Sequence, residues 1–232
     1  MSTQGYARPE LLAEADWLAE HLNDPNIRVV DCEAPDAYNR AHIAGAVNVG
    51  TNTYIKGQDS VHVMPPDDVA EFMGNRGIGD DTLVVTYDGR NGVTAARFWW
   101  VLNYYGHTNV KLLNGGWRKW FAEGRPVSDR ASSAPKAVFT PKVEPSLIIR
   151  GEELKSAIGR DRTAIWDVRS LGEYTGENTR GNKNSGHMPG CSHMEWTGVL
   201  DTEGLATFKP AEEIRRMLAE IGVTPEKQVY TY

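Results

Sequence analysis

The sequence predicts an α/β protein in which short parallel strands alternate with helices, and it predicts this arrangement twice. Short β-branched runs are separated by stretches with helical spacing of apolar residues in both halves of the chain. The two halves also share residues at one constant offset of 145 positions (187 − 42). The matching sets are His42, Gly45, Pro65, Gly77 and Tyr87 in the first half and His187, Gly190, Pro210, Gly222 and Tyr232 in the second.

In the first half, leucine and alanine at helical spacing predict an opening helix over Pro9–Leu22. The apolar run Ile27–Val30 ends at Asp31, as expected of a buried strand that delivers a polar residue to the edge of a sheet. Further strands are predicted over Ala46–Val49, Leu83–Tyr87 and Asn109–Leu113, and further helices over Pro65–Asn75, Val93–Tyr105 and Trp117–Glu123.

The stretch 126–146 is rich in proline, serine and alanine, and its composition predicts a linker. It divides the chain into domains at 1–125 and 147–232. The second domain is predicted to repeat the pattern, with a polar excursion over Gly176–Ser185. Its predicted elements are helices over Glu152–Ile158 and Pro210–Ile221 and strands over Ala164–Val168 and Lys227–Tyr232.

Composition narrows the classes of function. A net charge of −6 and a pI near 5.6 argue against a nucleic-acid partner. No apolar run approaches the roughly 18 residues of a membrane span. The first residues are acidic and do not resemble a signal peptide, so a cytoplasmic protein is expected. Cys32 and Cys191 are too few for a disulfide framework.

Three features together resemble the rhodanese-type sulfurtransferases with tandem domains. The first is a strand ending in aspartate, VVDCE at 29–33 and IWDVRS at 165–170. The second is a turn, AHIAGAV at 41–47 and GHMPGCS at 186–192. The third is YDGRNGVTAARFWW at 87–100 followed by GHTNVKLLNGGWRKW at 106–120, which is similar to the end of the non-catalytic first domain of that family.

The resemblance implies two rhodanese-like domains, each a parallel sheet flanked by helices. It implies a reaction in which a cysteine thiolate takes the outer sulfur of thiosulfate as a persulfide and passes it to an acceptor such as cyanide or a thiol. The partners are then a small anionic sulfur donor and a thiophilic acceptor, with no cofactor and no metal. We favour thiosulfate because DVRSLGEYTG is similar to bacterial thiosulfate enzymes, and 3-mercaptopyruvate is the alternative donor.

The resemblance also assigns site residues. Arg169 is expected to bind the anionic substrate through its planar fork, and the alternative is a surface arginine or one paired with Asp167. From their positions in the sequence, Arg180 is either a second anion contact or a solvated loop arginine, and Trp196 either lines the pocket wall or packs in the core. Asp88 stands in the non-catalytic loop where the catalytic domain has its cysteine. His187, Cys191 and His193 are metal-binding residue types, but the repeat places the first two in a structural turn, and we expect no metal there.

The family nucleophile directly follows the strand that ends at Tyr232, so we expect a cysteine as the next residue and an incomplete second domain in this sequence. We expect the chain to be cut there, by truncation or at a chemically modified cysteine. Two rival interpretations remain. A phosphatase of the related fold would have a loop one residue longer, and a rhodanese-like binding module would have no cysteine at all.

Overall fold

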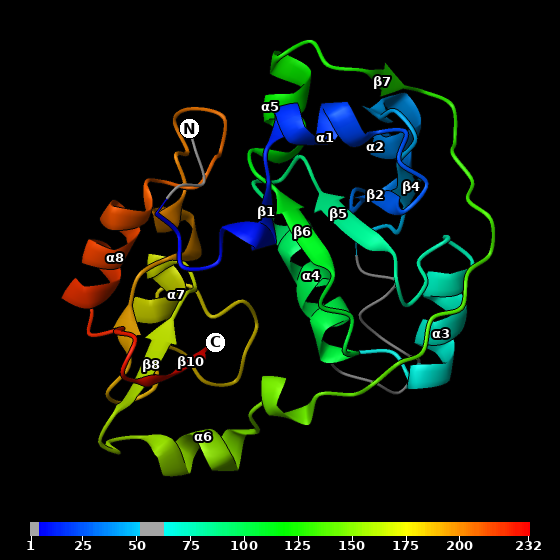
Figure 1. Ribbon diagram of the computed structural model, residues 1–232. Helices are drawn as coiled ribbons and strands as arrows, with labels where there is room; N and C mark the ends of the chain where they lie inside the picture. Colours follow the sequence, from blue (N-terminus) through cyan, green and yellow to red (C-terminus); the bar gives the residue numbers. More distant parts are fainter. Residues whose placement is uncertain (1–4, 52–62) are drawn as a thin grey trace. The chain divides into compact units, whose positions relative to one another are not determined.

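The computed structural model describes residues 5–51 and 63–232 (Figure 1). Within these ranges the chain separates into two compact units. The N-terminal unit contains Tyr6–Pro145 and a short segment, Thr202–Thr207. The C-terminal unit contains Ser146–Asp201 and Phe208–Tyr232, together with Gly5. Both units are α/β, as the sequence predicts.

The N-terminal unit is built on a five-stranded parallel sheet in the order β1-β6-β5-β2-β4. Its strands are β1 (Leu12–Ala13), β2 (Ile27–Asp31), β4 (Val47–Asn48), β5 (Leu83–Tyr87) and β6 (Val110–Leu113). β2 and β5 pair in register from Ile27 with Leu83 to Asp31 with Tyr87. The polar residues Asp31 and Asp88 therefore emerge at the same edge of the sheet.

Helices cover both faces of this sheet. Successive side chains of a strand point to opposite sides, so each strand contributes to a core on either face. The helices of the unit are η1 (Pro9–Leu11), α1 (Ala15–His21), α2 (Pro35–Arg40), α3 (Pro66–Gly74), α4 (Val93–Tyr104) and α5 (Gly116–Ala122). Val30 and Val84 pack with α3 and α4, whereas Val29 and Val85 pack with α1 and α5. A small antiparallel pair, β3 (His42–Ile43) and β7 (Val127–Ser128), closes the unit.

The opening helix predicted over Pro9–Leu22 is wrong in one respect. The chain forms the short turn η1, then the strand β1, and only then the helix α1. Leu12 and Ala13 pair in parallel with Leu112 and Leu113 of β6, so the sheet takes two residues that helical spacing assigned to a helix. The contact spans 100 residues of sequence (112 − 12), and local periodicity carries no information about it.

Part of the stretch predicted as a linker lies along the N-terminal unit. The backbone N–H groups of Ala137, Lys142 and Glu144 donate to the carbonyls of Gly74, Tyr105 and Tyr104. Two glycines allow this close approach: a Cβ at Gly74 would lie 2.6 Å from the Ala137 carbonyl oxygen, and one at Gly106 would lie 2.8 Å from that of Lys142. Phe139 is buried in the core of the unit.

The C-terminal unit has a three-stranded parallel sheet among its described residues, in the order β10-β8-β9. β8 and β10 are neighbouring parallel strands, and they lie where the sequence predicts strands over Ala164–Val168 and Lys227–Tyr232. The elements after the connecting turn η2 (Pro145–Leu147) are α6 (Gly151–Ala157), β8 (Thr163–Asp167), α7 (Leu171–Thr175), β9 (Ser192–His193), η3 (Trp196–Val199), α8 (Ala211–Glu220) and β10 (Gln228–Thr231).

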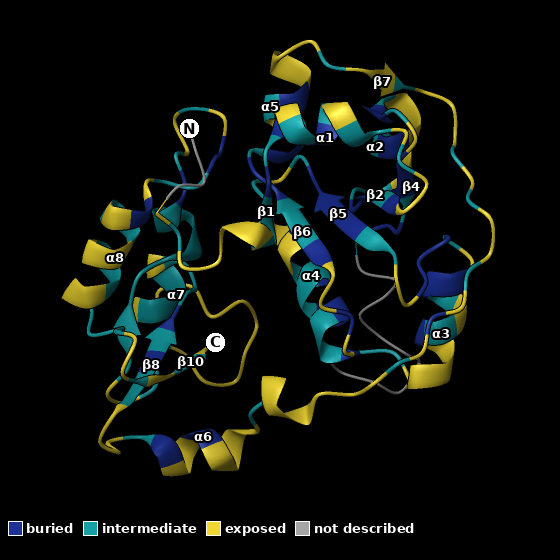
Figure 2. Ribbon diagram, viewed as in Figure 1, coloured by how far each residue is buried: buried dark blue, intermediate teal, exposed yellow. Residues whose placement is uncertain are grey.

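The strands of the two sheets differ in burial, as Figure 2 shows. Four of the five residues of β5 are buried, whereas β10 has none that is fully buried. β8 buries Ile165 and Asp167 and leaves its other residues partly accessible. No helix in the described ranges is long and apolar enough to cross a membrane.

Candidate active site

The loop after β5 in the N-terminal unit forms a ring of backbone donors, and the Asp88 carboxylate fills it. Oδ1 accepts hydrogen bonds from the N–H groups of Arg90 and Gly92, and Oδ2 accepts from the N–H groups of Thr94 and Ala95 and from the Thr94 hydroxyl. All five distances are 2.8 Å.

The loop can gather these donors because Asn91 and Gly92 have φ values of 62° and 89°, which turn successive N–H groups inward. α4 begins directly after them, so the positive end of its dipole also faces the carboxylate. Asp88 itself is almost completely buried. The loop is therefore an anion-binding loop whose anion is a side chain of the same unit.

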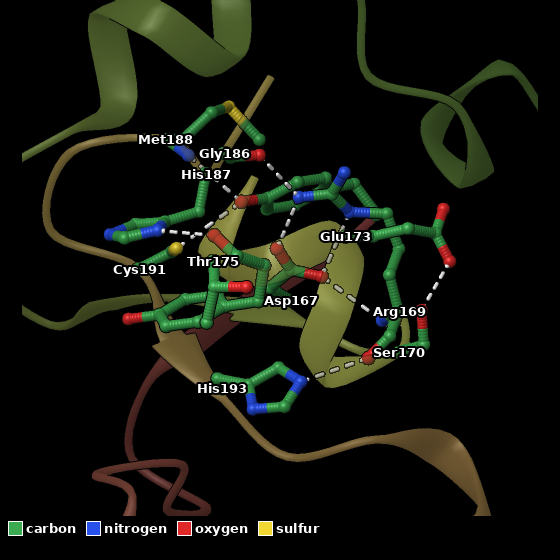
Figure 3. Close-up of polar contacts among 12 residues, drawn as sticks. Asp167, Arg169, Ser170, Glu173, Thr175, Gly186, His187, Met188, Cys191 and His193 are labelled. Atoms are coloured by element: carbon green, nitrogen blue, oxygen red, sulfur yellow. Dashed lines mark hydrogen bonds and ion pairs between the residues drawn. The ribbon is translucent and has the colours of Figure 1, made fainter. Parts of the chain in front are cut away.

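In the C-terminal unit, Arg169 is clamped by Asp167 just beyond the end of β8 (Figure 3). Nε and Nη2 of the guanidinium lie 3.0 and 2.6 Å from the two carboxylate oxygens, and the Arg169 backbone N–H donates to the same carboxylate at 3.0 Å. Burial would raise the pKa of Asp167, but the hydrogen bonds from Arg169 outweigh it, and the pKa is lowered. Asp167 is therefore a carboxylate at neutral pH.

Two further contacts fix the direction of the Arg169 side chain. Nη2 also donates to the Gly186 carbonyl at 2.9 Å, and the guanidinium carbon lies 5.0 Å from the centre of the Tyr232 ring. The fork formed by Nε and Nη2 thus faces Asp167 and Gly186. Nη1 is the part of the group left to meet an anion, so Arg169 is positioned but does not present the whole fork that the sequence suggested.

An aromatic stack supports the loop that carries Arg169. The Tyr174 ring stacks on His187 at 3.8 Å and on His193 at 4.5 Å. The Nδ1–H of His187 donates to the Tyr174 carbonyl at 2.9 Å, and the Nε2–H of His193 donates to the Arg169 carbonyl at 2.9 Å. Each imidazole thus uses one nitrogen to hold backbone, and within the described ranges no three metal-binding side chains converge.

The residues of the turn meet the end of β10. The Met188 backbone N–H donates to the Tyr232 hydroxyl at 3.0 Å, and the Cys191 sulfur lies 3.2 Å from the same oxygen. Burial raises the pKa of Tyr232, so its hydroxyl remains protonated at neutral pH. Cys191 is a partner of this hydroxyl, in keeping with the expected structural turn.

The structure links Arg180 to the Arg169 loop through Glu173, and it places the Trp196 backbone beside the end of β8. Arg180 forms an ion pair of 3.2 Å with Glu173, and Glu173 also accepts a 2.7 Å hydrogen bond from Ser170. Sequence reasoning missed Glu173, whose signal in the sequence is its place six residues after the strand-end Asp167. Trp196 begins η3, and its backbone N–H donates to the Val168 carbonyl at 3.0 Å.

A parallel α/β sheet with a strand–loop–helix anion ring, and with a turn anchored on a tyrosine at the strand ends, defines a rhodanese-like protein. The family model described as "Rhodanese-like domain" matches residues 14–123. The "Sulfur carrier protein TtuD" of Thermus thermophilus is 34% identical, with 98% of this chain and 84% of that protein covered. A "Putative thiosulfate sulfurtransferase" of Haloferax volcanii is 30% identical, with 100% and 84% covered.

Solved structures agree with this assignment. A 3-mercaptopyruvate sulfotransferase, SseA from Escherichia coli, matches with a TM-score of 0.84 at 25% identity, covering 95% of this chain and 87% of that one. An ergothioneine-bound EanB variant matches in fold with a TM-score of 0.85 at 22% identity, covering 97% of this chain and 61% of that one. The chain belongs to the rhodanese-type sulfurtransferase family.

Proposed function

We propose that the protein is a thiosulfate sulfurtransferase whose donor site is built around Arg169. The observation that carries the proposal is the clamp of Arg169 by Asp167, which holds a cation at the strand ends beside Tyr232. The Nη1 of a guanidinium fixed in this way would donate a charge-assisted hydrogen bond to an oxyanion such as the sulfonate end of thiosulfate. Arg180, paired with Glu173, is proposed as a second and more exposed anion contact, and Trp196 as part of the pocket wall.

The proposed nucleophile is a cysteine at the position that follows Tyr232. This position corresponds to Asp88, which follows Tyr87 and lies inside the ring of loop N–H groups. The same kind of ring would stabilise a thiolate and then a persulfide. The thiolate would attack the outer sulfur of thiosulfate, and sulfite would leave with the electron pair of the broken S–S bond. Attack by cyanide on the persulfide would release thiocyanate and restore the thiolate.

The proposal includes two rhodanese-like domains, 1–125 and 147–232, of which the first is non-catalytic and the second carries the donor site. In its favour, β10-β8-β9 has the same order and the same direction as β5-β2-β4. Val168 and Cys32 also donate equivalently to the carbonyls of Tyr232 and Tyr87. We place the reaction in the cytoplasm, where the two unpaired cysteines stay reduced.

The test is a donor comparison on the protein expressed from its complete gene. Thiocyanate is measured with thiosulfate and cyanide, and pyruvate is measured in parallel with 3-mercaptopyruvate and cyanide. A higher kcat/KM with thiosulfate supports the proposal. A preference for 3-mercaptopyruvate supports the alternative suggested by the likeness to the E. coli structure. A gene that encodes no cysteine after Tyr232 would instead support a binding module.

A further inference from the structure

The N-terminal unit has a pocket of its own at the edge of its sheet where Asp31 and Asp88 emerge. Its volume is about 360 Å³, at the small end of the range of about 300–1,000 Å³ typical of small-molecule sites. All of its lining residues belong to this one unit: Asp31, Glu33, Ala37, Arg40, Ala41, Tyr87, Gly89, Arg90 and Trp117.

Two small residues keep the pocket open. A Cβ at Gly89 would lie 3.1 Å from Glu33 Oε1 and 3.5 Å from the Trp117 ring, so any side chain there would fill the space between them. Ala37 stands where the C-terminal unit has Glu173, six residues beyond the strand end in both units (37 − 31 and 173 − 167). The long side chain that occupies this place in one unit is absent from the other.

The wall of the pocket is negative. Glu33 Oε1 accepts a 2.7 Å hydrogen bond from the Gly89 N–H, and among the described residues no donor reaches Oε2. Asp31 is already satisfied by the Tyr87 hydroxyl at 2.5 Å and the Glu33 N–H at 2.8 Å. The loop donors that could hold an anion are taken by Asp88. Glu33 is therefore the group that remains to bind a ligand, and it favours a cation.

The rim of the pocket is positive. Arg40 and Arg90 are both exposed, and Arg40 pairs with Asp36 at 3.1 Å. The Arg90 guanidinium has no acidic group within 4.0 Å in the described part of the chain. The pocket therefore offers a carboxylate and an indole on its wall, two alanines beside them and a guanidinium at its mouth.

We propose that this pocket binds a small zwitterion of amino-acid size. The ammonium group would lie against Glu33 Oε2 and the Trp117 ring, where a carboxylate and an aromatic system both attract a cation. The carboxylate would face Arg90, and an aliphatic side chain would pack on Ala37 and Ala41. Glu33 stands at the position equivalent to Arg169 and has the opposite charge, and the proposed site is independent of sulfur transfer.

The test uses L-leucine, N-acetyl-L-leucine and L-leucinamide as probes in saturation-transfer NMR with the purified chain. N-acetyl-L-leucine lacks the ammonium and L-leucinamide lacks the carboxylate. L-Leucine should bind saturably with a dissociation constant of about 1 mM. N-acetyl-L-leucine should bind about tenfold more weakly or not at all, because the charge that meets Glu33 is gone. L-Leucinamide should lose less affinity than N-acetyl-L-leucine, because an ion pair with the exposed Arg90 contributes little.

Three variants assign the binding to this pocket. Glu33→Gln keeps an acceptor for the Gly89 N–H and should weaken the binding of L-leucine about tenfold. Gly89→Ala should abolish binding by filling the space between Glu33 and Trp117. Glu71→Gln, an exposed carboxamide change outside the pocket, should bind as the parent does, and thermal unfolding should show that all three are folded. The proposal is overturned if L-leucine shows no saturable signal, if the N-acetyl analogue binds equally well, or if Glu33→Gln leaves binding unchanged.

Discussion

The two units end equivalent strands on an aspartate and then carry opposite charges two residues later. Asp31 and Asp167 both accept a hydrogen bond from the N–H two residues later, at Glu33 and Arg169. In the N-terminal unit that residue is an acid, and burial raises the pKa of Asp31. In the C-terminal unit it is an arginine, and its hydrogen bonds lower the pKa of Asp167 despite burial. The residue two positions beyond the strand end thus has opposite charge in the two units, and with it the pKa of the strand-end aspartate shifts in opposite directions.

The largest expected effect comes from emptying the anion ring of the N-terminal unit. Asp88→Ala removes a buried carboxylate that accepts five hydrogen bonds and leaves the donors without a partner. At about 1–3 kcal/mol for each unsatisfied buried donor, partly relieved by water, unfolding free energy should fall by at least about 3 kcal/mol. Urea denaturation measures it.

Asp80→Ala is the matched control, because the exposed Asp80 carboxylate accepts two hydrogen bonds from Thr140. Asp80→Ala should lower the unfolding free energy by about 1 kcal/mol. Equal losses in the two variants would show that the Asp88 ring contributes nothing special. Asp88→Asn, which keeps the shape, should fall between them.

The next effect concerns the charge that distinguishes the units. In the protein expressed from its complete gene, Arg169→Ala should raise KM for thiosulfate by about 10- to 100-fold, because a charged hydrogen bond is worth about 1.5–3 kcal/mol. Arg160→Ala, an exposed arginine on Ser156, is the control and should leave KM unchanged. An unchanged KM in Arg169→Ala would reject a substrate role for this residue.

A smaller effect tests the segment that lies along the N-terminal unit. Gly106→Ala places a Cβ 2.8 Å from the Lys142 carbonyl at a φ of 80°, whereas Gly124→Ala has a φ of 66° and open space around it. Both carry the strain of positive φ, so their difference isolates the contact. Gly106→Ala should lose about 1–2 kcal/mol more than Gly124→Ala in urea denaturation. Similar losses would mean that the segment gives way without cost.

The smallest expected effect is on the pH dependence of stability, and its sign differs between Asp31 and Asp167. Asp31 has a raised pKa, so its contribution to stability is present below the unfolded pKa and is lost as pH rises through the folded value. Asp167 has a lowered pKa, so its contribution is present above the unfolded pKa and is lost as pH falls through the folded value. Between about pH 3 and 6, Asp31→Asn and Asp167→Asn should therefore change the pH dependence of stability in opposite directions. Shifts of the same sign would refute the comparison.

Long, periodic elements were predictable, and short ones set by distant partners were not. The predicted helix over Val93–Tyr105 and the strand over Leu83–Tyr87 match α4 and β5 closely. α2 and α7 have six and five residues, too few for a helical period to show. β1 forms by pairing with β6, which is distant in sequence. Local spacing carries no sign of that pairing and therefore predicts one helix over the opening stretch.

The candidate site was predictable in type and not in geometry. Arg169 follows a strand-end aspartate in the sequence, but the use of its fork by Asp167 depends on a side-chain torsion that spacing does not reveal. Tyr38 and Tyr174 stack on His42 and His187 in the two units, yet they lie 136 positions apart (174 − 38) rather than 145. The polar excursion Gly176–Ser185 accounts for the nine extra residues. A comparison at one constant offset therefore does not reveal this correspondence.

The Asp88 carboxylate also fixes how the N-terminal loop responds to dissolved salts. Because the carboxylate is part of the chain, it meets the ring of N–H groups at a high effective concentration, and a free anion must displace it to bind. Sulfate, phosphate or sulfite at ordinary concentrations therefore compete poorly for this loop. We therefore expect the loop to keep the same conformation in buffers of different anion content, and we expect anion titrations of the protein to report on other sites.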